Sequence, residues 1–144
     1  MVPVPRLLAS TLFAFALVAA ACGSNGGGSD GPSAPPSGAL GPVTAEAATG
    51  AVRGLCDLRT ATDRAEAEAT FLDRSHETLH VIAAATEVRN RDAAADLLEA
   101  KQRVEADLAE TEMPPDFAAD VEALIEATRA AIDAIGLEAP ACPA

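Results

Sequence analysis

A helical repeat of apolar residues near the C-terminus is the feature that most constrains how this chain can fold. Between residues 117 and 135, apolar side chains and one threonine recur every three or four positions: Phe117, Val121, Leu124, Thr128, Ile132 and Ile135. This spacing places all six on one face of an α-helix, whereas a strand would divide them between its two faces. The segment therefore predicts an amphipathic helix that buries this face against a partner.

The remaining sequence from residue 43 onward also favours helices. Ala, Leu, Glu and Arg dominate, and no alternating run of β-branched residues indicates a strand. Residues that start or stop helices predict four of them: from Thr44 to about residue 62, from about Asp63 to about Val88, from about Ala93 to Glu110, and from after Asp116 to Ile135. Residues 65–70 either continue into the second helix or form a separate short turn. The short connections predict an all-α, up-and-down helical bundle spanning residues 43–144.

The expected core consists of apolar stripes on these helices. The second and third helices contribute a set at helical spacing: Leu72, Leu79, Ile82, Ala83, Thr86, Leu97, Leu98, Val104 and Leu108. Gly50 and Gly54 give the first helix a small face where another backbone can approach closely.

Composition limits the function classes. The chain has 144 residues, a length that suits one domain, and 22 acidic residues against 10 Lys and Arg give a net charge of −12. Nucleic acids are polyanions and need a basic surface, so neither DNA nor RNA is expected as a partner.

The N-terminus carries an export signal. Arg6 is the only charge before Leu7–Ala21, an uncharged and mostly apolar stretch that is short for a membrane-spanning helix but suits a secretory leader over residues 1–21. The string Val18-Ala19-Ala20-Ala21-Cys22 resembles the lipobox of bacterial lipoprotein precursors, although Ala19 stands where these usually have Leu. The resemblance covers residues 1–23 and implies that Cys22 is lipidated and becomes the mature N-terminus. The alternative is an ordinary signal peptide, whose removal would leave Cys22 as a free thiol.

A segment rich in Gly, Ser and Pro separates this cysteine from the first predicted helix. Residues 22–42 hold seven of the ten glycines and little that can be buried, so they predict a disordered linker. Together with the lipid anchor, the linker predicts a domain held at the extracytoplasmic face of the plasma membrane. The membrane, reached through the lipid, and an envelope protein are the expected partners.

Two further cysteines lie within the predicted domain. After export, Cys56 and Cys142 would meet an oxidising compartment, which favours a disulfide between them. A redox or metal role for the pair is the alternative, but no CxxC spacing supports it.

One string matches a catalytic motif. Residues 76–80 read His76-Glu77-Thr78-Leu79-His80, which resembles the H-E-x-x-H motif of zincin metalloproteases and contains both histidines of the chain. The resemblance implies that His76 and His80 bind Zn²⁺, with Glu77 as general base and Glu99 as a possible third ligand. Because the resemblance covers five residues and no strand is expected to hold a substrate, a metallopeptidase is the least favoured reading.

A milder reading of this string treats it as part of a surface strip. On an ideal α-helix His76 and His80 share one arc with three carboxylates: Asp73, Glu77 and Glu87. Such a strip can bind Zn²⁺ or Cu²⁺ weakly or respond to pH. It can equally be a solvated face on which Asp73 and His76 make an ordinary contact three residues apart.

The sequence therefore predicts a non-enzymatic, lipid-anchored binding or accessory protein that needs no cofactor. Envelope metal binding or sensing through His76 and His80 is the alternative.

Overall fold

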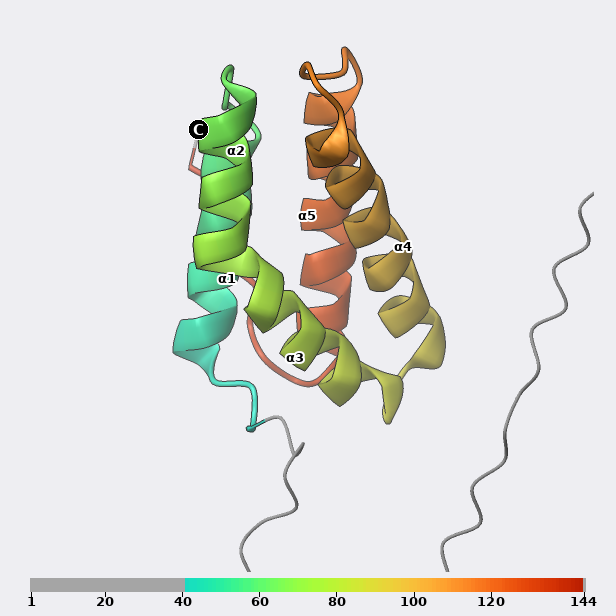
Figure 1. Cartoon of the computed structure of the whole chain (residues 1–144). Coiled ribbons are helices and arrows are strands. Elements are labelled where there is room, and N and C mark those ends of the chain that lie inside the picture. Colours follow the sequence, from blue (N-terminus) through green and yellow to red (C-terminus); the bar gives the residue numbers. More distant parts are fainter. Residues whose placement is uncertain (1–40, 144) are drawn as a thin grey trace, which may run out of the picture. The chain divides into compact units, whose positions relative to one another are not determined.

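The structure, a computed structural model, describes residues 41–143 as a bundle of helices (Figure 1). Its elements are α1 (Ala45–Leu58), α2 (Arg64–Phe71), the π-helical turn η1 (Leu72–His76), α3 (Glu77–Glu87), α4 (Arg91–Ala109) and α5 (Phe117–Ala134), with no strand in this part of the chain. Because α2, η1 and α3 follow one another without a break, they form one bent helix, and the predicted all-α bundle of four helices is confirmed. The predicted leader, Cys22 and most of the predicted linker lie outside the described residues.

Three helices begin at or within about two residues of the positions that the sequence predicts. The side chains of Thr44, Asp63 and Asn90 each accept a hydrogen bond from the backbone N–H three residues later, at 3.1, 2.9 and 3.1 Å. These bonds satisfy amides that have no partner within the helix. The N-termini of α1, α2 and α4 are therefore determined by local chemistry.

The first helix ends earlier than predicted, at Leu58 rather than near residue 62. The backbone N–H and the hydroxyl of Thr60 both donate to the carbonyl oxygen of Asp57, at 3.2 and 3.0 Å. A threonine that bonds the backbone in this way offers it an alternative to the helical pattern. The chain consequently turns before Asp63 starts α2.

The last helix ends at a glycine, as predicted. Gly136 has a φ of 81°, a left-handed conformation that favours glycine, and the N–H of Leu137 donates to the carbonyl of Ile132 at 3.2 Å. The reversal sends residues 137–143 back across the bundle to α1 (Figure 1). There Cys142 forms the predicted disulfide with Cys56, with their Cα atoms 5.5 Å apart.

The core lies where the four helices meet. Its largest fully buried side chains come from every helix: Leu55, Leu58, Phe71, Leu79, Ile82, Leu97, Val104, Val121, Leu124 and Ile132. The core prediction is wrong for two residues, because Leu72 is 52% exposed and Leu98 is 38% exposed. Leu72 lies in the π turn, which changes the phase of the apolar stripe. Leu98 follows the buried Leu97, and adjacent helical residues point about 100° apart.

Packing between the helices also uses polar groups. The buried hydroxyl of Thr86 on α3 donates to the carbonyl of Ala131 on α5 at 3.1 Å. A buried hydroxyl without such a partner would lower stability by about 1–3 kcal/mol. None of the helices in the described part of the chain is long and apolar enough to cross a membrane.

Candidate functional site

The π turn η1 determines which side of the continuous α2–η1–α3 helix, which carries both histidines, faces the core. The buried positions Ala67, Phe71, Ser75 and Leu79 lie four residues apart. In an ideal α-helix, three such steps rotate the side chains by a total of about 120°, which is wider than a typical apolar face. The five residues of η1 contain the one-residue insertion of a π-helix, which cancels this drift and bends the helix. All four side chains therefore reach the same core.

On its inner side the π turn contacts α1 closely. The hydroxyl of Ser75, which is 1% exposed, donates to the carbonyl of Ala51 at 3.0 Å. Gly54 provides the space, since a Cβ built there would lie 2.5 Å from the Ser75 Oγ and 2.9 Å from the Arg74 Cβ. The predicted close approach at the glycines of α1 is confirmed for Gly54, whereas Gly50 has no such atom within 4 Å.

On the side facing α4, the π turn places His76 beside an ion pair. Its Nε2 lies 3.0 Å from Glu105 Oε1, and the same oxygen accepts from Lys101 Nζ at 2.6 Å. The Lys101 side chain, from the only lysine of the chain, is 4% exposed, and those of His76 and Glu105 are about one third exposed. A buried ammonium group needs a counter-charge, which Glu105 provides.

The second histidine of the motif packs against the first. The rings of His76 and His80 meet edge to face with their centroids 5.0 Å apart, and the rings of Phe71 and His76 also meet edge to face, at 5.6 Å. Such edge-to-face pairs are favourable in proteins. His80 lies on the side of α3 that faces α4, where it lines a hollow between the two helices.

The structure does not gather the predicted strip of Asp73, His76, Glu77, His80 and Glu87 into a metal centre. Within residues 41–143 no group of three or more His, Cys, Asp or Glu side chains is arranged to hold a metal ion. The expected contact between Asp73 and His76 is replaced by the one between His76 and Glu105, because the π turn departs from the ideal helix on which the expectation rested. Metal binding by His76 and His80 stays a prediction.

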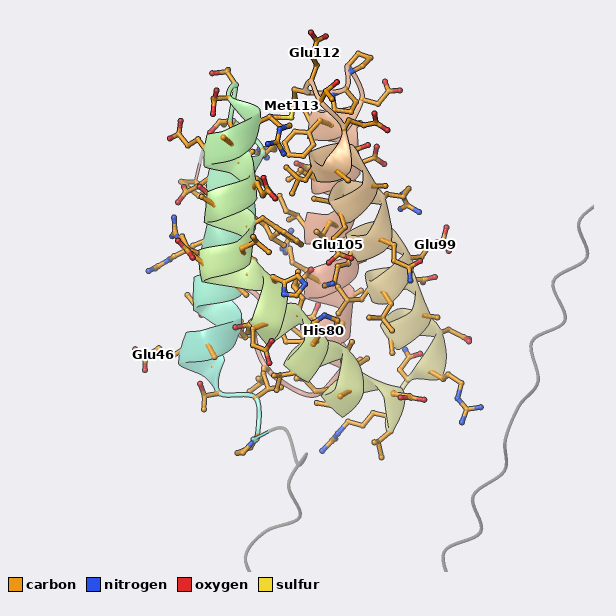
Figure 2. The ribbon with its side chains drawn as sticks, viewed as in Figure 1. Glu46, His80, Glu99, Glu105, Glu112 and Met113 are labelled. Atoms are coloured by element: carbon orange, nitrogen blue, oxygen red, sulfur yellow. A yellow bond between two sulfur atoms is a disulfide. The ribbon has the colours of Figure 1, made fainter. Side chains whose placement is uncertain are left out.

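The carboxylate suggested by the zincin resemblance lies elsewhere. Glu99 is 74% exposed and pairs with Arg103 on its own helix at 2.9 Å, and in Figure 2 it points away from His80. Glu105, which the sequence reading missed, is the carboxylate that meets His76. The spacing of Lys101 and Glu105, four residues apart on one helix, was the one signal that could have found the pair.

Next to His80, α3 and α4 enclose a hollow of about 380 Å³. Alanines and one leucine form most of its lining, with three polar residues among them: His80, Ala83, Ala84, Glu87, Arg91, Ala94, Ala95 and Leu98. Apolar hollows that carry a few polar groups are the usual form of binding sites. We call these eight residues the α3–α4 hollow.

A pair of carboxylates at the α4–α5 interface was also missed by the sequence reading. Burial raises the pKa of Asp107 above its ordinary value of 3.8, and the negative charge of Asp120 raises it further. One carboxylate oxygen of Asp107, Oδ2, is buried without a hydrogen-bond partner. The Nε of Arg103 lies 3.3 Å from Oδ1 of Asp120, so the positive charge of Arg103 compensates Asp120 more directly than Asp107.

Comparison of the chain with protein-family models, with curated proteins and with solved structures finds no match.

Proposed function

We propose that this protein is exported, lipidated at Cys22, and held at the extracytoplasmic face of the plasma membrane, where its helical domain has a non-enzymatic binding or accessory role. The disulfide between Cys56 and Cys142 is the observation that carries the proposal. Disulfides persist in oxidising compartments and are rare where thiols are kept reduced. The predicted signal peptide at residues 1–21 would supply the route to such a compartment.

The surroundings of the histidines support a binding role. His76 faces Glu105 on α4, and His80 packs against His76. Beside His80, the α3–α4 hollow offers a mostly apolar surface suited to a partner.

Metabolic labelling with palmitate tests the anchor. In a bacterial host the wild-type protein should incorporate the label and sediment with membranes, whereas Cys22→Ala should incorporate none. The matched control is the pair Cys56→Ala and Cys142→Ala, which removes the other cysteines and should leave labelling intact. An unlabelled wild-type protein released in soluble form would contradict the proposal and favour an ordinary signal peptide.

Metal binding is the second candidate, and one observation favours it. Glu105 supplies a carboxylate 3.0 Å from His76, whose ring lies 5.0 Å from that of His80. Two imidazoles and a carboxylate are a common set of Zn²⁺ ligands, although these three side chains are not arranged to hold a metal ion as they stand and would have to move to bind one. Lys101 competes for the same carboxylate, so a metal ion would have to displace it.

Calorimetric titration of Zn²⁺ and Cu²⁺ into the purified protein tests this candidate. The expected result is a dissociation constant in the micromolar range or below. Loss of this binding both in the His76→Ala, His80→Ala double variant and in Glu105→Gln would establish metal binding at these residues. Glu99→Gln, which changes an exposed carboxylate on the same helix, should have no effect. Absence of heat with both metals, or binding that survives the double variant, would remove this candidate.

A further inference from the structure

The α3–α4 hollow has a shape that a second helical surface can fill. Its lining includes four alanines, two from each helix: Ala83, Ala84, Ala94 and Ala95. Small side chains on neighbouring helices leave a depression into which a larger side chain of another helix can pack. Ala84 and Ala95 are exposed, so this depression opens at the surface.

A larger side chain of the required kind lies in the same patch. Leu98 lines the hollow and is 38% exposed, one of three large apolar side chains exposed in the described part of the chain. A surface that carries both a partly exposed leucine and an alanine-lined depression is able to complement itself. In a two-fold symmetric dimer the same patch is used by both copies, so each leucine can enter the hollow of the other.

The charges in the hollow fit the same arrangement. Glu87 at the end of α3 and Arg91 at the start of α4 have opposite charges, and neither makes an ion pair within residues 41–143. Two-fold symmetry allows Glu87 of one copy to meet Arg91 of the other, and the reverse pair follows automatically. With a net charge of −12, two copies of the chain repel each other over most of their surfaces. At the α3–α4 hollow the opposite charges of Glu87 and Arg91 balance, so this repulsion is reduced.

We propose that the α3–α4 hollow binds a second copy of this chain, with Leu98 entering the partner copy's hollow and Glu87 pairing with the partner copy's Arg91. The proposal does not depend on the lipid anchor, since the surface lies entirely within α3 and α4. It adds a specific partner to the domain: the protein itself.

The test is the molecular mass of the full chain, purified in detergent and measured by sedimentation over a range of concentrations. The wild-type protein should have the mass of two copies. Glu87→Arg turns both expected ion pairs into repulsions and should raise the dimer dissociation constant at least about tenfold. The charge-swapped double variant Glu87→Arg, Arg91→Glu should restore dimerisation, which a variant damaged in its fold would not do.

A second variant fills the hollow. Ala95→Glu places a long charged side chain in an exposed position of the hollow and should give a monomer with unchanged helix content by circular dichroism. The matched control is Ala118→Glu, at an exposed position of α5 outside the hollow, which should stay dimeric. A wild-type monomer at about 100 µM would leave the hollow to a different occupant and overturn the proposal. Association that Glu87→Arg and Ala95→Glu leave unchanged would also overturn it.

Discussion

At the scale of single residues, the contact between Gly54 and the π turn leaves no room for a side chain at Gly54. A hydrogen is the only side chain that fits at Gly54, because a Cβ there would meet the Oγ of Ser75 at 2.5 Å. Ser75 cannot move away without losing its hydrogen bond to the carbonyl of Ala51. The absence of a Cβ at Gly54 thus allows α1 and the α2–η1–α3 helix to approach each other.

Gly54→Ala should therefore destabilise the protein by about 1–3 kcal/mol, because the new methyl group forces α1 and the π turn apart. The same change at Gly50, another glycine inside α1, should stabilise it by about 0.5–1 kcal/mol, because alanine favours the helix and meets nothing within 4 Å. Urea unfolding monitored by circular dichroism measures both. Equal effects of the two substitutions would contradict the role assigned to Gly54.

Asp107 is a second residue whose environment has a measurable consequence. Its pKa is raised by burial and by Asp120, so the folded protein binds this proton more tightly than the unfolded chain does. The group contributes stability when protonated, and this contribution is lost as pH rises through the folded-state pKa. At neutral pH the ionised Asp107 therefore opposes folding.

Asp107→Asn should raise the melting temperature by a few degrees at pH 7, because a neutral amide replaces a disfavoured charge. The difference from wild type should shrink as the pH falls toward the ordinary carboxylate value of 3.8, where Asp107 is increasingly protonated. Thermal unfolding between pH 4 and pH 7 provides the measurement. Asp96→Asn, an exposed site on the same helix, is the control, and a destabilised Asp107→Asn at pH 7 would refute the argument.

At the scale of elements, the π turn η1 determines which residues the α2–η1–α3 helix presents to α1 and to α4. If residues 67–79 formed an ideal α-helix with no residue removed, the buried positions before and after residues 72–76 would not share one core. With the π turn, Ser75 faces α1 and His76 faces Glu105. The insertion also explains why Leu72 is exposed although it has the spacing of a core residue.

Deleting Asp73, an exposed residue of η1, should convert the π turn into an ordinary α-helical turn. The buried positions would then follow alternating steps of four and three residues, the pattern of a straight α-helix. We expect stability within about 1 kcal/mol of wild type or higher, because regular α-helical hydrogen bonding replaces the π-helical turn. Melting temperature and helix content by circular dichroism measure the outcome.

The control is deletion of Ala84, which lies in the regular helix α3 and is also exposed. That deletion should rotate the rest of α3 by about 100° and severely destabilise the bundle. If the Asp73 deletion proves as damaging as the Ala84 deletion, the insertion is not what sets the register of this helix.

At the scale of the whole molecule, the disulfide joins the end of the chain to its first helix. The bond spans 86 positions and connects Cys142, after the reversal at Gly136, to Cys56 in α1. Leu137 and Ala139 pack against the core along the way. The C-terminal segment has no helix of its own to hold it, so the covalent bond fixes it to the bundle.

The double variant Cys56→Ala, Cys142→Ala should lower the free energy of unfolding by about 4–5 kcal/mol, because it frees a long loop in the unfolded chain. Urea unfolding of the wild-type protein with and without reductant gives the same comparison without mutation. Hydrogen exchange should show loss of protection near Leu137 before loss in α4 and α5. A reduced protein as stable as the oxidised one would show that the bond contributes nothing to folding.

The sequence by itself determined the four helices, the starts of three of them, the glycine at the end of α5 and the pairing of Cys56 with Cys142. These follow from local chemistry, namely side-chain caps, apolar spacing and the small number of available thiols. Only the tertiary structure decided that His76 meets Glu105 and Lys101, that Leu98 is left exposed beside an alanine-lined hollow, and that Asp107 lies against Asp120. Each of these depends on how one helix is rotated against another. For His76, a single π-helical insertion, held by contacts with α1 and α4, sets that rotation without changing the helical character of the sequence.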